Sequence, residues 1–108
     1  MASKGNRKTE RIAVEVGIVR SQYGSDNPAA TVTGGTEFRR LAAMHRVEAA
    51  VWDVLAGLEE NGGTAYRRWA VCGNRDCYRV EMEPCEGAEP GKGLAILKAA
   101  AKLAAMWK

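Results

Sequence analysis

The sequence predicts an α+β domain of element order β-α-β-β-α, with a small three-stranded, mainly antiparallel sheet packed by one long central helix and a C-terminal helix. Apolar residues alternate with others over 12–18, helix-forming residues run without Pro over 36–60, and two extended segments flank the turn residues at 73–76. Period-two alternation is typical of a strand, and turn residues between two such segments indicate a hairpin. We expect a flexible basic arm at 1–9 and a single α+β domain over 10–108.

The first strand is predicted to point four apolar side chains inward: Ile12, Val14, Val16 and Ile18. The segment 21–35 follows and is rich in Ser, Gly, Asn, Pro and Thr. These residue types favour turns, so the sequence predicts a long loop here, with at most a short extended piece at 30–32.

The central helix is predicted to begin at Thr36, whose side chain can accept a hydrogen bond from the first turn, and to end before Asn61. Apolar residues cover a broad arc of its surface, and we expect the sheet to bury Leu41, Val51, Trp52 and Leu55. This arc is wider than a small sheet can cover. The sequence therefore predicts a homodimer.

The hairpin is predicted to have its arms at 64–72 and 77–83. A turn centred on 74–75 would place Cys72 opposite Cys77 and Arg68 opposite Glu81. The same register gathers five apolar residues on one face: Trp69, Val71, Tyr78, Val80 and Met82. A second, alanine-rich helix is predicted over 91–108, packed against the domain.

The chain has 108 residues, a net charge of +3 and 27% charged residues, which is ordinary for a globular protein. No apolar segment approaches the length of a membrane span. The basic N-terminal segment leads into no apolar signal core. We therefore expect a cytoplasmic protein without a membrane partner.

The three cysteines, Cys72, Cys77 and Cys85, are one ligand short of a structural zinc site. The single histidine, His45, lies within the predicted helix, where we expect a partly buried core residue. We therefore predict no metal and no cofactor, and reduced thiols. A cross-strand disulfide between Cys72 and Cys77 is the alternative in an oxidising compartment.

The glycine-rich segment 86–93 resembles a phosphate loop only superficially. Three residues separate Gly87 from Gly91, and Gly93 stands where such a loop needs Ser or Thr. The sequence offers no nucleophile beside a base, so no catalytic residue is predicted. We expect a protein that is not an enzyme, and a small thiol- or metal-dependent enzyme is the least favoured alternative.

Two kinds of partner fit the charge pattern. A nucleic acid would contact the basic arm and the hairpin through Lys4, Arg7, Lys8, Arg11, Arg67 and Arg75. The segment 81–89 carries four Glu and no Lys or Arg, which would repel a phosphate backbone. A protein partner is therefore favoured, and its predicted contacts are Tyr23, Tyr66, Arg68, Arg75 and Arg79.

The sequence thus predicts a small non-enzymatic interaction protein that binds and occupies a macromolecular partner. Inhibitors of host systems encoded by phages and other mobile elements are often small chains of this kind. That comparison rests on size and on the lack of catalytic motifs alone.

Overall fold

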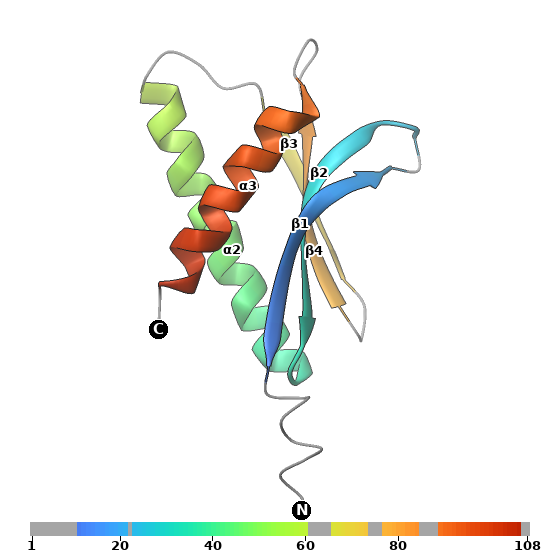
Figure 1. Ribbon diagram of the computed structural model, residues 1–108, viewed down its shortest axis with the longest axis vertical. Helices are drawn as coiled ribbons and strands as arrows, with labels where there is room; N and C mark the ends of the chain where they lie inside the picture. Colours follow the sequence, from blue (N-terminus) through green and yellow to red (C-terminus); the bar gives the residue numbers. More distant parts are fainter. Residues whose placement is uncertain (1–10, 22, 61–65, 74–76, 85–88, 107–108) are drawn as a thin grey trace, which may run out of the picture.

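The computed structural model describes residues 11–21, 23–60, 66–73, 77–84 and 89–106, and within these it leaves the side chains of 66–72 and Pro84 undescribed. The elements are β1 (Ile12–Arg20), β2 (Asp26–Gly34), α2 (Glu37–Glu60), β3 (Tyr66–Gly73), β4 (Cys77–Pro84) and α3 (Pro90–Ala105). All strand pairs are antiparallel, in the order β1-β2-β4-β3. Both helices lie on one side of the sheet (Figure 1). The α+β class, the antiparallel sheet and the two helices are confirmed.

The sheet has four strands rather than the three predicted. The additional strand, β2, occupies most of the segment expected to be a loop. It lies between β1 and β4, and Ala29 and Ala30 are almost fully buried. Pro28, which has no N–H to donate, lies just before the stretch paired with β4, Ala29–Thr33. Small side chains and one well-placed proline therefore build a central strand from residues that usually favour turns.

The true connection between β1 and β2 is a short turn. The backbone N–H of Ser21 donates to the carbonyl of Ser25 at 2.8 Å, and the N–H of Ser25 donates back to Ser21 Oγ at 3.1 Å. Gly24 adopts φ +88°, a conformation that glycine accepts without strain. The Ser21 side chain thus supplements the backbone hydrogen bond at this end of the hairpin.

The start of α2 is as predicted, because Thr36 Oγ1 accepts a hydrogen bond from the N–H of Arg39 at 3.3 Å. The orientation of the helix differs from the prediction. Val51 is fully buried and Leu41 and Leu55 are half-buried, whereas Trp52 is 51% exposed. The buried face instead combines Met44, Val47 and Val51 with Ala43 and Ala50, whose small side chains allow a close approach of the neighbouring elements.

His45 is not a core residue, contrary to the prediction. Its side chain is 62% exposed, and its Nδ1 lies 3.1 Å from Glu48 Oε1. It lies on the side of α2 that faces solvent, together with Trp52.

The main core forms where α2 and α3 meet the inner face of the sheet. α3 begins with Pro90 in its first turn, a position where the missing N–H costs nothing. The following residues of this core are buried: Ala30, Val47, Ala50, Val51, Met82, Ile96, Leu97, Ala100 and Ala104.

The predicted register of the β3–β4 hairpin is wrong by two residues. Cys72 lies opposite Arg79 rather than Cys77, and Arg68 lies opposite Glu83 rather than Glu81. A Cβ at Gly73 would collide with the ring of Tyr78, so glycine at this position permits the observed pairing. A shift of two keeps the same faces, because side chains alternate with period two. Val80 and Met82 are buried as predicted.

Candidate partner-binding groove

The inner face of β1 is only partly covered by the helices. Ile12, Val14 and Val16 point inward as predicted and are half-buried, while Ile18 is 44% exposed, contrary to the prediction. The cause is the position of β1 at the edge of the sheet, beyond the main layer formed by α2 and α3. Exposed apolar patches on protein surfaces often mark interaction sites.

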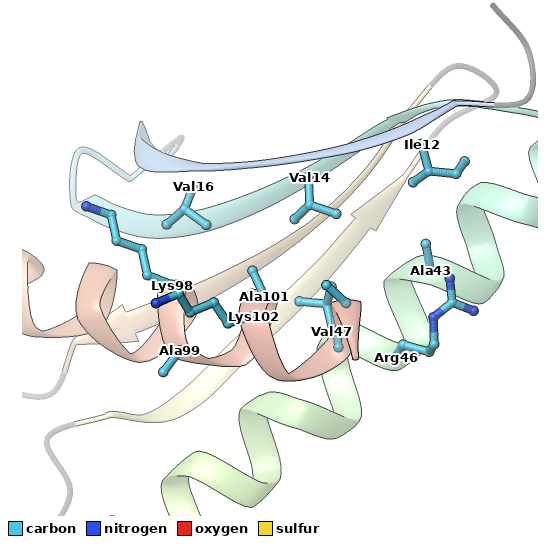
Figure 2. Close-up of a pocket in the computed structure, with 12 residues that line it drawn as sticks. Ile12, Val14, Val16, Ala43, Arg46, Val47, Lys98, Ala99, Ala101 and Lys102 are labelled. Carbon is cyan, nitrogen blue, oxygen red and sulfur yellow. The ribbon is translucent and has the colours of Figure 1, made fainter. Parts of the chain in front are cut away.

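A groove of about 860 Å³ runs between β1, α2 and α3, and we call it the β1–α3 groove. Figure 2 shows Ile12, Val14 and Val16 projecting from β1 toward the helices. The apolar lining consists of β-branched residues from the strand and mostly small residues from the helices: Ile12, Val14, Val16, Val47, Ala43, Ala99, Ala101, Ala104 and Ala105. The alanines of α3 leave this space open, because they are too short to reach β1.

Three cations border the groove: Arg46 from α2, and Lys98 and Lys102 from α3. Among the described residues, no Asp or Glu lines the groove and none forms a salt bridge with these three side chains. Like charges around an apolar floor repel one another. A ligand that brings carboxylates to the rim would relieve this repulsion.

The backbone of β1 also favours a peptide ligand. Its pairing with β2 runs without a shift from Ile12 opposite Gly34 to Arg20 opposite Asp26. Natural edge strands are usually protected by bulges, by proline or by charged side chains. The described strand β1 has no bulge and no proline, and its charged residues are Glu15 and Arg20. Half of its backbone groups therefore face away from β2 in a regular row.

A partner strand added beside β1 would use both features together. Its backbone would hydrogen bond to the free edge, and alternate side chains would point into the groove. Apolar side chains would meet Val14 and Val16, and acidic ones would reach the lysines of α3. The arrangement therefore fits an extended segment in which apolar and acidic residues occur on one face.

The described residues predicted to contact a protein come from different parts of the sheet. Tyr23 is 89% exposed at the tip of the β1–β2 hairpin. Arg79 lies on the sheet face without helices, where its Nε donates to Glu81 Oε2 at 3.0 Å. Tyr66 and Arg68 belong to β3, at the opposite edge of the sheet from β1. The position of Arg75 falls outside the described residues, so these predictions stay untested.

The predicted nucleic-acid contacts fall mostly in parts of the chain that the structure leaves undescribed. Lys4, Arg7, Lys8 and Arg75 lie outside the described residues, and the side chain of Arg67 is not described. Arg11 is exposed immediately before β1. The nucleic-acid alternative therefore remains a prediction.

The sheet face without helices carries a second polar feature. Asn27 Nδ2 donates to Glu81 Oε1 at 3.4 Å, and both residues are less than 10% exposed, at 6% and 8%. Arg79 supplies the charge that balances the Glu81 carboxylate. This cluster explains how a carboxylate is kept buried in the middle of β4.

The chain matches no known family model, no curated protein and no solved structure. In the part that the structure describes, no helix is long and apolar enough to cross a membrane. Likewise, no three metal-ligating side chains come together among the described residues.

The groove is not predicted by the sequence. Its floor depends on β1 being an edge strand, and that position follows from β2, whose residue types resemble those of a loop. One sequence signal does point to it. Lys98 and Lys102 are spaced for one helix face, beside alanines that cannot cover a strand.

Proposed function

We propose that the protein is a non-enzymatic interaction protein that takes an extended segment of a protein partner into the β1–α3 groove. The observation that carries this proposal is the combination of a regular edge strand, without bulge or proline, and an apolar, positively charged groove directly beneath it. Only a peptide chain uses the backbone edge and the groove at the same time. The partner segment has apolar and acidic side chains on the face that meets the groove.

By occupying its partner in this way, the chain would act as small inhibitors encoded by mobile elements do. We propose in addition that it is a homodimer, because α2 presents Phe38, 79% exposed, and Trp52, 51% exposed, outside the groove. Large aromatic residues so exposed on one helix are typical of an interface.

Selection from a displayed library of random peptides tests the proposal, because it requires no identified partner. Wild-type protein is expected to enrich peptides whose alternate positions carry both apolar residues and Asp or Glu, so that the two kinds share one face of the extended chain. The variant Lys98→Glu/Lys102→Glu should lose these peptides, since each reversed pair changes affinity by up to about fivefold and two act together. Lys92→Glu is the matched control, because Lys92 is exposed on the same helix and does not line the groove.

Two outcomes would contradict the proposal. Enrichment that is equal for wild type and the double variant would place the binding site elsewhere. Tight binding to random duplex DNA or RNA, falling steeply with salt and with no peptide enriched, would favour a nucleic-acid partner instead.

A further inference from the structure

The solvent-facing side of α2 carries a regular row of residues spaced alternately by four and three. We call this row the α2 seam, and its members are Phe38, Ala42, His45, Ala49, Trp52 and Ala56. All six are exposed, and the opposite side of the helix is the buried one. Alternating spacings of four and three keep residues on one line along a helix and are the pattern of a two-helix interface. The seam extends over ~27 Å at 1.5 Å per residue.

Large and small residues alternate along the seam in a way that fits a second copy. In an antiparallel pair with its two-fold axis level with position 47, residues equally distant from 47 on either side face each other. Phe38 then meets Ala56 of the second copy, Ala42 meets Trp52, and His45 meets Ala49. Every large side chain faces an alanine, which is how facing layers interdigitate without voids. A parallel pair would instead place Trp52 against Trp52 and leave gaps between alanines.

The charges beside the seam also favour an antiparallel pair. One flank carries Arg39 and Arg46 in its first half and Asp53 and Glu60 in its second half, and no salt bridge within the described residues uses them. These pairs are offset along the axis by five residues from an exact facing position. The lean of helical side chains toward the N-terminus and the length of the arginine side chain bring Arg46 within reach of Asp53 of the other copy, and Arg39 within reach of Glu60. Both copies contribute each pair, giving four interhelical ion pairs.

The other flank is compatible with this arrangement. Leu41 and Leu55, both half-buried in one copy, would lie near each other across the pair, because their distances from position 47 are nearly equal. Glu48 would lie near the two-fold axis in both copies, with its carboxylate beside His45 at 3.1 Å in each. The two glutamates are the one unfavourable juxtaposition, and each lies beside the histidine of its own copy.

We infer that the protein forms a two-fold homodimer through antiparallel packing of the α2 seams. The inference rests on the proposed self-association and adds its geometry. The dimer interface lies outside the β1–α3 groove except at Arg46, which borders both. Each dimer therefore presents two grooves.

Disulfide trapping tests the register. In a background with Cys72, Cys77 and Cys85 replaced by Ser, the double variant His45→Cys/Ala49→Cys should form a covalent dimer within minutes under oxidised glutathione. The single variant Ala49→Cys should react at least about tenfold more slowly, because the position faces His45 rather than itself. Trapping of the single variant as fast as that of the double variant would indicate parallel pairing, in which position 49 faces itself, and would overturn the inference.

A second test leaves the native cysteines in place. Sedimentation velocity at about 100 µM should show a dimer for wild type and for Ala95→Glu, an exposed alanine of α3, and a monomer for Ala42→Glu. The reason is that Ala42→Glu sets a carboxylate against Trp52 of the other copy. If Ala42→Glu remains dimeric, the protein self-associates through a surface other than the α2 seam. If wild type is monomeric, both are wrong, and the groove proposal is untouched.

Exchanging the charges of Arg39 and Glu60 tests whether the two residues form an ion pair between the copies. Arg39→Glu and Glu60→Arg should each raise the dimer dissociation constant by about three- to tenfold, because each places like charges together in both symmetric pairs. The double variant should recover to near the wild-type value. Additive weakening in the double variant would overturn the antiparallel arrangement.

Discussion

Arg40 reaches back from the first turn of α2 and donates a hydrogen bond from Nη1 to the backbone carbonyl of Gly35, at 2.7 Å. The same nitrogen lies 3.2 Å from the carbonyl of Gly34, and Arg40 is only 8% exposed. Carbonyl oxygens of the β2–α2 turn thus compensate a buried cation. This contact fixes the direction in which α2 leaves the sheet, and with it the position of both the groove and the seam.

Removal of this side chain is therefore expected to destabilise the fold. Arg40→Ala should lower the free energy of unfolding by about 2–4 kcal/mol, because it removes the hydrogen bonds to the turn and leaves a cavity. Urea denaturation followed by circular dichroism measures the change. The neighbouring Arg39→Ala, exposed to solvent, should change stability by no more than about 0.5 kcal/mol when both variants are measured at a concentration too low for self-association. Equal effects for the two variants would mean that the turn does not depend on Arg40.

Replacing each of two glycines by alanine should change the free energy of unfolding in opposite directions. Gly34 has φ +84°, and a Cβ there would collide with the backbone carbonyl of Arg11. Gly34→Ala should therefore lower the free energy of unfolding by at least about 2 kcal/mol. Gly57 lies within α2, with nothing within 4 Å of an added Cβ, so Gly57→Ala should raise stability by about 0.5–1 kcal/mol. Thermal unfolding of both variants decides the prediction, and a destabilised Gly57→Ala would contradict it.

The orientation of α2 can be tested with two adjacent residues. Val51→Ala should cost about 2–3 kcal/mol, because the side chain is fully buried in the main core. Trp52→Ala should cost about 1 kcal/mol or less when measured at a concentration too low for self-association, because half of its surface is exposed. A loss of about 3 kcal/mol or more for Trp52→Ala would mean that α2 is rotated to bury the tryptophan, as its apolar arc suggests.

The Asn27–Glu81 contact predicts that the stability cost of a substitution at Asn27 depends on the residue at position 81. Asn27→Asp places a second carboxylate beside Glu81 in a buried position and should cost about 2–4 kcal/mol. Adding Glu81→Gln should recover part of that loss, because one of the two like charges is removed. Chemical denaturation of the three variants measures the coupling. Simple addition of the two single effects would show that the residues do not interact.

Some of the fold follows directly from local sequence signals. The Thr36 cap, the helix-forming run after it and the alternation at Ile12, Val14 and Val16 predict elements whose bounds nearly coincide with the structure. The central strand β2 cannot be predicted in this way. Its polar and small residues favour a turn locally, and only pairing with neighbours on both sides makes it a strand.

The two proposed interaction surfaces can be predicted from the sequence only in part. The excess apolar arc of α2 is visible in the sequence, but its direction is not, because Ala43 and Ala50 pack inward and Trp52 does not. The β1–α3 groove is not visible either, since it arises from three elements distant in the chain. The predicted hairpin register fails because it requires a turn of two residues, whereas the observed pairing has a longer connection.

Amide hydrogen exchange by NMR, with and without a peptide enriched on the wild-type protein, is the most direct test of the proposed partner site. If a segment adds to the edge of the sheet, the amides of β1 that point away from β2 should become protected from exchange by about tenfold or more, while those of β4 at the centre of the sheet should change little. Resonances of Lys98 and Lys102 should shift together with them. Bound peptide with unchanged exchange in β1, and with shifts confined to other surfaces, would contradict the account.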